Sequence, residues 1–195
     1  MAGKQAKLIS DRDLARLSRL IGQNRYAARD RAILLLSAKA GLRACEIAGL
    51  TWAMVLDPRG QVGDVIELRD AIAKKGRGRT VPINPDLKLA LTRLWSTAAP
   101  AITTDGPVIA SERGGSFRAS SIVNWFAVLY RRAGLDGCSS HSGRRTFITK
   151  AARLVHRVGG SIRDVQQLAG HASIDMTQRY IEGDTHAKRA LVKLL

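Results

Sequence analysis

One change of hydrophobic period limits the folds that this chain can adopt. From residue 10 to about 50, and again from residue 120 onward, apolar residues recur with the spacing of amphipathic helices. Between these regions the sequence turns to two β-rich pieces, VIEL at 65–68 and RTVPI at 79–83, around the basic turn KKGRGR at 74–79. We therefore expect a mainly α-helical α+β fold with one small antiparallel β-sheet.

Start and stop signals place the predicted helices. Ser10 is a good N-cap residue, and the carboxylates of Asp11 and Asp13 favour the first turn of the helix that follows. The remaining helices are predicted over residues 26–40, 43–50, 84–95, 120–133, 142–157, 161–169, 173–182 and 185–194, and a further short strand over 107–110. Because no linker or repeat interrupts the pattern, we expect one domain over residues 10–195, preceded by a basic N-terminal extension, residues 1–9.

The charge balance indicates a polyanionic partner. The 195 residues include 32 lysines and arginines but only 16 aspartates and glutamates, which gives a formal net charge of +16. An excess of this size repels itself and typically serves to bind nucleic acid. A basic surface that only keeps the protein soluble is the alternative, and charge alone does not show whether chemistry follows binding.

Several classes of site lack their usual signals. The chain has no HExxH, P-loop or GxGxxG motif, so nothing favours a zinc hydrolase, a nucleotide hydrolase or a dinucleotide enzyme, and we expect no metal and no cofactor. Cys45 and Cys138 form no CxxC pair and are predicted to be free, mostly buried thiols. Because no apolar run is long enough to cross a bilayer and no signal peptide is recognisable, we expect a cytoplasmic, DNA-associated protein with no membrane contact.

Two basic features of the first half can each be structural or functional. Arg43 follows a helix-terminating glycine and Glu46 lies one turn later, so the two can simply form an i,i+3 ion pair. Alternatively, an arginine at the start of a helix suits a phosphate, because the amide groups there add positive charge. The turn KKGRGR can be a solvated hairpin tip, a contact to the DNA backbone, or the source of a lysine general acid.

The second half adds two histidines, an arginine and a tyrosine. In HSGRRTF, His141 and Arg144 are three residues apart and share one face if a helix begins there. His171 lies at a predicted turn between two helices. Nine residues later, Tyr180 falls on the apolar side of a helix together with Met176. Taken singly, each of these residues is explained by packing or by a turn.

Taken together, these residues stand in the order Arg, Lys, His-x-x-Arg, Gly-His and Tyr, and the sequence then resembles the tyrosine recombinase (phage integrase) family. The motifs GLRACEI, KKGRGRTVPI, HSGRRTF and LAGHASIDMTQRY carry the resemblance, which runs from about Leu8 to the end of the chain. It implies a tyrosine recombinase catalytic domain, in which a small antiparallel sheet packs on a helical bundle. The chain is similar to the short fimbrial-type DNA invertases in showing no N-terminal core-binding domain.

The resemblance implies a role for each matched residue. Tyr180 is the nucleophile that attacks the scissile phosphate and forms a 3′-phosphotyrosyl link, without metal or ATP. Arg43 and Arg144 bind the non-bridging oxygens, and His171 donates a further hydrogen bond. Lys74, seven residues before the valine of the VPI strand, protonates the 5′-oxygen that leaves.

Other assignments leave alternatives open. Lys75 competes with Lys74 for the role of general acid. His141 either accepts the proton of Tyr180 or binds the phosphate. Glu46 supports the arginine and histidine groups, because a carboxylate facing the phosphate would be repelled. Contacts with DNA are also expected from four basic side chains, Lys75, Arg77, Arg79 and Arg145.

Two features concern packing and assembly. Gly143 stands where the HxLR motif of the family usually has leucine, and we expect looser packing beneath Arg144. Residues 184–195 have the apolar spacing of an amphipathic helix, which either packs on its own domain or docks in trans on a neighbouring protomer. The resemblance implies double-stranded DNA as partner, a homo-oligomer that is a tetramer on DNA, and an accessory helper or DNA-bending protein.

Three functions fit these residues. A site-specific recombinase or integrase cleaves and rejoins DNA through the tyrosine link. A non-catalytic DNA-binding module would keep the fold but has no use for a tyrosine nucleophile. An enzyme like the type IB topoisomerases would nick and reseal DNA without sequence-specific exchange. The six matched positions together favour the recombinase.

Overall fold

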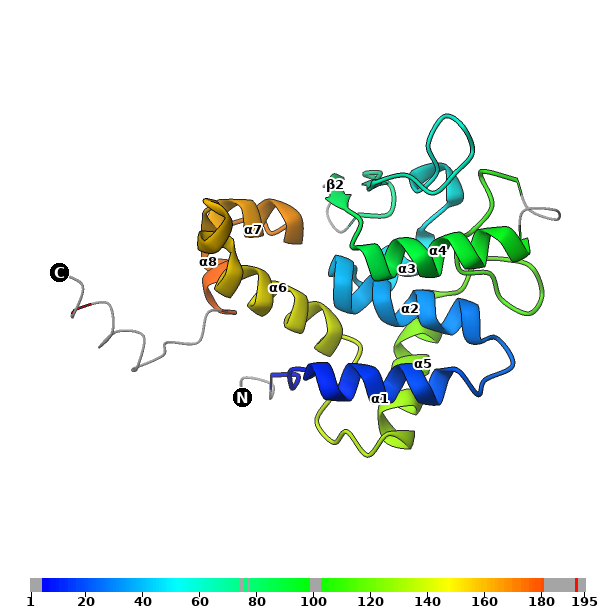
Figure 1. Ribbon diagram of the computed structural model, residues 1–195, viewed down its shortest axis with the longest axis horizontal. Helices are drawn as coiled ribbons and strands as arrows, with labels where there is room; N and C mark the ends of the chain where they lie inside the picture. Colours follow the sequence, from blue (N-terminus) through cyan, green and yellow to red (C-terminus); the bar gives the residue numbers. More distant parts are fainter. Residues whose placement is uncertain (1–4, 74–75, 77, 99–102, 181–191, 193–195) are drawn as a thin grey trace.

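The computed structural model describes residues 5–73, 76, 78–98, 103–180 and 192. It is mainly helical, as predicted (Figure 1). The α-helices are α1 (Asp11–Ile21), α2 (Ala27–Ala40), α3 (Ala44–Gly49), α4 (Pro85–Ala98), α5 (Ala119–Arg132), α6 (Ser142–Leu154), α7 (Ile162–Ala169) and α8 (Ile174–Gln178). Two short 3₁₀ helices, η1 (Trp52–Met54) and η2 (Val155–Val158), follow α3 and α6. The expectation of a helical α+β fold is confirmed.

The predicted hairpin is present as a two-stranded sheet. Strands β1 (Val65–Leu68) and β2 (Arg79–Pro82) pair antiparallel, with Val65 opposite Pro82 and Leu68 opposite Arg79. Buried and exposed residues alternate along both strands, as expected where one face of a sheet packs on a core and the other meets solvent. The pairing sets Arg79 at the loop end of the hairpin, next to the helices of the site described below.

Helix α2 is the centre of the larger of two apolar clusters. Its residues 32–36, the AILLL run, are all buried, and a helix that is apolar on every side requires neighbours all round. Helices α1, α4 and α6 pack against it, and Figure 1 shows α1 and α4 on opposite sides of α2. The glycine after α2, Gly41, has the left-handed conformation that commonly ends a helix.

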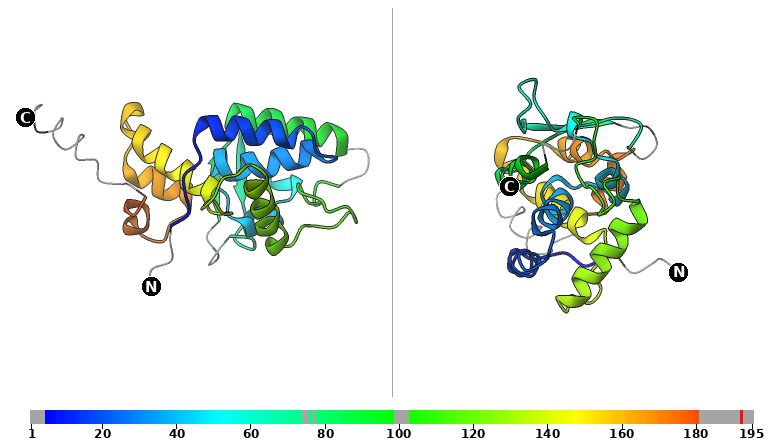
Figure 2. Two further views of the ribbon diagram at one scale, coloured as in Figure 1. Left: turned by 90° about the horizontal axis from the view of Figure 1, so that it is seen from below. Right: turned by 90° about the vertical axis from the view of Figure 1, so that its right-hand side faces the viewer.

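A second apolar cluster lies at the other end of the molecule. It joins Ile148 and Ala152 of α6 to Val165 and Ala169 of α7, and Tyr180 packs against it. Helix α6 therefore contacts α2 near its beginning and α7 further along. The views in Figures 1 and 2 show α6, α7 and α8 gathered at one end of the molecule.

The structure corrects several predicted boundaries. Helix α4 is longer than expected, α6 changes to the 3₁₀ helix η2 after Leu154, and α8 ends at Gln178. The strand predicted over residues 107–110 is wrong, because this segment forms only isolated bridges at its two ends. It begins with Pro107, which has no N–H to donate to a ladder, and it runs directly into a tight turn. The helix predicted over 185–194 lies outside the described residues.

The described part of the N-terminal extension lies along the domain. The backbone N–H of Ile9 donates to Thr146 Oγ1 of α6 at 2.8 Å, and the Ile9 side chain is buried. Arg145 Nη1 donates to the carbonyl of Ala6 at 2.5 Å. Residues 5–9 are thus held beside the first turns of α6. No helix in the described ranges is long and apolar enough to cross a bilayer.

Candidate active site

The C-terminal end of α7 gathers three arginines from distant parts of the chain. The carbonyl oxygens of residues 168, 169 and 170 accept hydrogen bonds, in that order, from Arg79 Nε at 2.8 Å, Arg144 Nη2 at 2.5 Å and Arg43 Nη2 at 3.4 Å. The last carbonyls of a helix lack intrahelical partners and carry partial negative charge. They therefore hold the three guanidinium groups close together despite their mutual repulsion.

A buried carboxylate supports two of these arginines. Glu46 is fully buried and accepts hydrogen bonds from Arg43 Nη1 at 2.8 Å and from Arg79 Nη1 and Nη2 at 2.9 and 3.0 Å. Burial alone would raise the pKa of Glu46, but the hydrogen bond and charge of Arg79, together with the backbone N–H and charge of Arg43, outweigh it and lower the pKa to about 2. The carboxylate is ionised at neutral pH, and the predicted ion pair of Arg43 with Glu46 is confirmed.

The GLR segment links Arg43 to Arg144. Arg43 is the N-cap residue of α3, and the carbonyl of Gly41, two residues earlier, accepts from Arg144 Nη1 at 2.5 Å. Gly41 has a φ of 66°, and a Cβ added there would lie 2.4 Å from the ring of Phe147. Only glycine satisfies both the backbone conformation and the close approach. The short loop between α2 and α3 thus sets one arginine directly beside the other.

Arg144 is almost completely removed from solvent, with 4% of its surface exposed. Burial and the positive charges of Arg43 and Arg79 lower its pKa to about 10, against the opposing charge of Glu46. The guanidinium still carries its proton at neutral pH. A desolvated cation among other cations is stabilised by an anion that enters beside it, and a phosphate group has the charge and the acceptor geometry for arginine.

His171 occupies the turn between α7 and α8 and is buried. Its Nδ1 lies 3.0 Å from Oγ1 of Thr177, which is also buried. Burial and the charges of Arg144, Arg43 and Arg79 lower the pKa of His171 to about 4. The imidazole is therefore neutral at physiological pH and is fixed in orientation by the Thr177 hydroxyl.

Tyr180 stacks on this imidazole. The two ring centroids are 5.4 Å apart and the ring planes differ by 24°. The backbone of Tyr180 is held on both sides, because its N–H donates to the carbonyl of Thr177 at 3.0 Å and its carbonyl accepts from Thr149 Oγ1 at 3.3 Å. The nine-residue spacing of the sequence thus corresponds to direct contact between the two side chains.

Two cavities open beside these residues. One, of about 180 Å³, is lined by Gln5, Ala6, His141, Arg144, Arg145, Arg179 and Tyr180. The other, an open cleft of about 410 Å³, is lined by Asp70, Gly76, Gly78, Arg79, Arg163, Gln166, Gln167, Gly170 and His171. The arginine group and the stacked rings therefore border space that a substrate can enter.

Sequence comparison identifies the family. The model of the phage integrase family matches residues 8–186. The chain belongs to the phage integrase family. It is 35% identical over 155 residues to tyrosine recombinase XerC of Nitrobacter winogradskyi, which covers 78% of this chain and 45% of that protein. With XerC of Bradyrhizobium diazoefficiens the identity is 31% over 182 residues, or 91% of this chain and 54% of that one. The chain thus spans about half the length of these relatives.

Solved structures of the family share the fold. The crystal structure of XerA recombinase superposes with a TM-score of 0.73 at 26% identity, covering 96% of this chain and 65% of that one. The integrase of transposon Tn1549 in complex with a circular intermediate DNA gives a TM-score of 0.75 at 18% identity, covering 100% and 67%. The fold is that of a tyrosine recombinase catalytic domain, as the sequence predicted.

The structure brings together most, but not all, of the family positions predicted from sequence. Arg43, Arg144, His171 and Tyr180 lie in one group. His141 is the exposed N-cap residue of α6 and faces the smaller cavity together with Tyr180, whereas its partner in the HxxR motif is buried. Three predicted basic residues, Lys74, Lys75 and Arg77, lie outside the described residues.

Arg79 differs from its predicted role as a DNA contact. Its side chain is only 7% exposed, and its three donor nitrogens point inward to Glu46 and to the carbonyl of Leu168. Sequence reasoning also missed Thr177, whose hydroxyl holds His171. Thr177 could have been found from its position, six residues after the histidine. A short helix that turns back at this point brings the hydroxyl to the imidazole. Arg145, another predicted DNA contact, lines the smaller cavity and donates a hydrogen bond to the carbonyl of Ala6.

Two predictions about packing are wrong. Gly143 does not loosen the structure, because α6 approaches α2 so closely that a Cβ at this position would lie 2.4 Å from Ser37 Oγ. Met176 does not form an apolar side with Tyr180, since it is 39% exposed. The reason is that α8 is only five residues long, so Tyr180 follows it in a turn instead of continuing its helical face.

The two thiols are also less buried than expected. Cys45 is exposed on α3 and Cys138 is half-buried, and both are free. Within the ranges that the structure describes, no group of three or more histidine, cysteine, aspartate or glutamate side chains is arranged to hold a metal ion.

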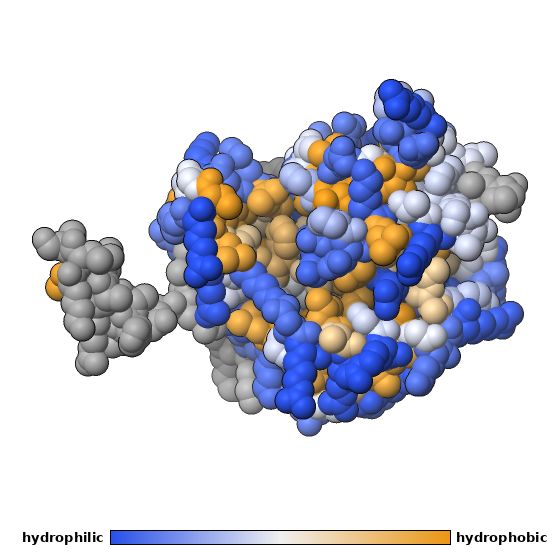
Figure 3. Space-filling view, viewed as in Figure 1, coloured by the Kyte–Doolittle hydropathy of each residue, from blue (hydrophilic) through white to orange (hydrophobic). Residues whose placement is uncertain are grey.

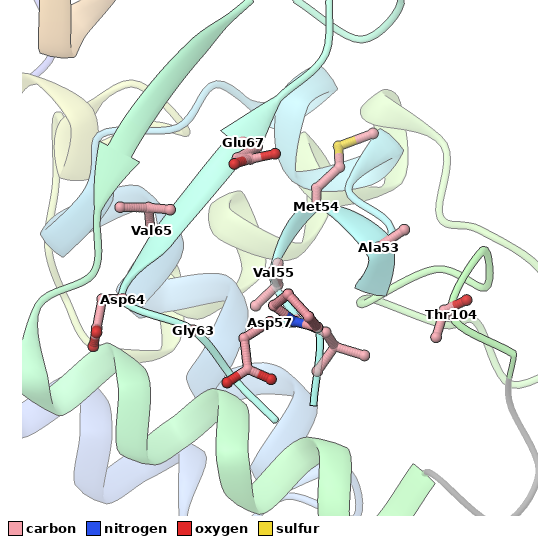
Figure 4. A pocket seen from close by; sticks show the side chains of 11 residues that line it. Ala53, Met54, Val55, Asp57, Gly63, Asp64, Val65, Glu67 and Thr104 are labelled. Carbon is pink, nitrogen blue, oxygen red and sulfur yellow. The ribbon is translucent and has the colours of Figure 1, made fainter. Parts of the chain in front are cut away.

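A larger cavity, of about 490 Å³, lies away from this site (Figure 4). Asp57, Asp64 and Glu67 line it among apolar residues of η1 and β1. Asp57 accepts hydrogen bonds from backbone N–H groups of its own turn, and Asp64 pairs with Lys88. Carboxylates repel a phosphodiester, so this cavity does not suit a nucleic acid.

Figure 3 shows one face of the molecule coloured by hydropathy. This face is mostly hydrophilic at its edges, with apolar residues toward its centre.

Proposed function

We propose that this domain cleaves and rejoins DNA strands as the catalytic part of a site-specific recombinase, through a 3′-phosphotyrosyl intermediate. The observation that carries the proposal is the stacking of Tyr180 on His171, in a site where Tyr180 and the buried Arg144 line the same cavity. A tyrosine hydroxyl has no structural need for a neutral histidine and a cluster of cations. A nucleophile that attacks a phosphodiester needs such an environment.

The phosphate would bind between the guanidinium groups of Arg144 and Arg43. Each guanidinium has five N–H donors, and the two carbonyl bonds of Arg144 leave three donors for the non-bridging oxygens. Arg43, with 19% of its side chain exposed, supplies further donors from the other side. Removing one preorganised donor of this kind typically costs ~10²–10³ in rate.

The neutral His171 would act as a hydrogen-bond donor. In the tautomer in which Nδ1 accepts from the Thr177 hydroxyl, the ring proton is on Nε2. That N–H can then donate to a phosphate oxygen. The pKa of about 4 in the free domain means that the donor is available without protonation of the ring at neutral pH.

The reaction proposed here is a transesterification. The Tyr180 oxygen forms a bond to phosphorus as the bond from phosphorus to the 5′-oxygen breaks. The tyrosine proton passes to a base, for which His141 is the proposed acceptor because it lines the same cavity. Lys74 is the proposed donor of a proton to the 5′-oxygen. Since one phosphoester replaces another, a 5′-hydroxyl can reverse the step and rejoin the strand without ATP.

The partner is proposed to be double-stranded DNA. Relatives of this fold include XerH, solved bound to its difH substrate, and a lambda integrase dimer solved on a core site. Exchange between two duplexes requires four active sites, so we propose a homotetramer on DNA, with a helper protein as a further partner. Residues 184–195 are proposed to dock in trans, and deleting them should spare DNA binding but impair cooperative assembly on a target site. Unchanged assembly would contradict this role.

The proposal is tested with a nicked suicide substrate. DNA duplexes selected by the protein from a random-sequence library are synthesised with a nick, so that the 5′-hydroxyl product diffuses away after cleavage. We expect a covalent protein–DNA adduct that resists SDS and is lost in Tyr180→Phe but kept in the control Tyr26→Phe. DNA binding with no adduct on any selected duplex would favour the non-catalytic module. Relaxation of arbitrary supercoiled plasmid without recombinant products would favour an enzyme like the type IB topoisomerases.

A further inference from the structure

Arg79 makes more internal hydrogen bonds through its side chain than the other arginines of the site. Nε donates to the carbonyl of Leu168, and Nη1 and Nη2 both donate to the carboxylate of Glu46. This bidentate contact is the geometry that guanidinium and carboxylate groups prefer. Because only 7% of the side chain is exposed, these three hydrogen bonds are directed at the protein and not at solvent.

Through these bonds Arg79 contacts the supports of two proposed phosphate ligands. Oε1 of Glu46 accepts from both Arg79 and Arg43. The carbonyl of Leu168 lies in the last turn of α7, three residues before His171. Gly170, between them, has a φ of 59°, and a Cβ there would lie 2.9 Å from Arg79 Nη1. The Arg79 side chain is therefore packed directly on the turn that presents the histidine.

The charges explain why a third arginine is useful. Without Arg79, the carboxylate of Glu46 would be neutralised by Arg43 alone, and that guanidinium would have less positive charge to offer a phosphate. With Arg79 in place, the two arginines and one carboxylate retain one net positive charge. The bidentate contact also leaves Arg43 with a single side-chain bond to Glu46.

We propose that Arg79 is a positioning residue for the strand-cleavage reaction. In this role, which rests on the proposed function, Arg79 acts through Glu46 and the end of α7 to hold Arg43 and His171 in place for the scissile phosphate. It does not itself bind DNA. Lysine cannot replace it, because an ammonium group lacks the planar fork needed for the bidentate contact and for Leu168 together.

The first experiment separates positioning from DNA contact. Arg79→Lys should reduce the single-turnover rate of adduct formation ~10- to 100-fold, with the dissociation constant for DNA and its salt dependence unchanged. Arg69→Lys, an exposed arginine directly after β1, is the matched control and should cleave like the wild type. If Arg79→Lys instead weakens binding and lowers the slope of log K against log salt by about 0.9, Arg79 is a phosphate ligand and the inference is wrong.

A second measurement separates positioning from a general loss of structure. In a substrate with a methylphosphonate at the scissile position, a neutral methyl group replaces one charged oxygen, so the positive charge of the arginines matters less. The rate penalty of Arg79→Lys should then shrink to within a few-fold. An equal penalty on both substrates would show that the substitution only damages the fold, and urea unfolding of the variant provides an independent check.

A double-mutant cycle tests the route through Glu46. If Arg79 acts in part through this carboxylate, Arg79→Lys should cost less in the Glu46→Gln background than in the wild type. Fully additive defects would overturn the inference. Absence of any adduct with the wild-type domain would remove the proposed function and this inference together, whereas a wild-type adduct with an unaffected Arg79→Lys rate would remove the inference alone.

Discussion

The ring of Tyr180 lies on the ring of His171, with 5.4 Å between centroids, and the other face of the site is formed by arginines. The contact joins the proposed nucleophile to a proposed phosphate ligand. It depends on α8, a helix of five residues that returns the chain to the turn after α7. Any change that moves this turn should therefore affect the phosphate site and the nucleophile at the same time.

Thr177→Val should lower the single-turnover rate of strand cleavage. The valine side chain fills the same volume but leaves Nδ1 of His171 without its partner at 3.0 Å. One hydrogen bond is worth about 1 kcal/mol, so we expect a loss of about fivefold in the single-turnover rate. Thr177→Ser keeps the hydroxyl and should retain most of the activity. A fully active Thr177→Val would show that the histidine is held by packing alone.

The stability of the free domain should fall between about pH 6.5 and pH 4 because of His171. Its pKa is lowered to about 4 in the folded state, so the unfolded chain binds the proton first, and acidification through this window favours unfolding. Urea unfolding of His171→Gln should show a shallower dependence on pH over the same window. His156→Gln, at an exposed histidine of η2, controls for the loss of an imidazole. Identical slopes for His171→Gln and the wild type would contradict the assignment.

Glu46→Gln should destabilise the domain at neutral pH by about 3 kcal/mol or more, because it leaves Arg43 and Arg79 without their buried counter-charge. The pKa of Glu46 is lowered to about 2. Its contribution is therefore complete above about pH 4.5 and is lost as the pH falls toward 2. Chemical unfolding from pH 5 to pH 2.5 should show a steeper loss of stability in the wild type than in the variant, because both proteins keep His171 and the other carboxylates. A variant as stable as the wild type at pH 7 would mean that the arginines are solvated instead.

Gly143→Ala should destabilise the domain by about 1–3 kcal/mol, because the added methyl group meets Ser37 Oγ. Ser37→Ala should be neutral or slightly stabilising, since this buried hydroxyl has no hydrogen-bond partner among the described residues. The double variant should recover part of the loss, and the coupling is measured by thermal unfolding of all four proteins. Strictly additive effects would show that the two helices move apart instead.

Much of this protein was predictable from local sequence. The N-cap at Ser10, the glycine that ends α2 and the alternating strands of the hairpin depend on interactions between near neighbours. The family was indicated in the same way, because residue types and spacings are properties of the chain itself: six residues stand in the family's order, Arg43, Lys74, His141, Arg144, His171 and Tyr180. The strand predicted over residues 107–110 was wrong because a strand depends on pairing with a partner strand, and that partner lies far away in the sequence.

Only the tertiary structure decided which of the basic residues belong to the site. Arg79 reads from sequence as one more charge on a basic turn, yet it donates to a carboxylate 33 residues away and to a carbonyl 89 residues away. Gly143 and Tyr180 show the same limit. Hydrophobic periodicity predicts neither the close contact of α6 with α2 at Gly143 nor the end of α8 before Tyr180. The sequence by itself determined the elements and the chemical groups. Long-range burial and charge decided their roles, since both depend on what the fold brings within a few ångströms.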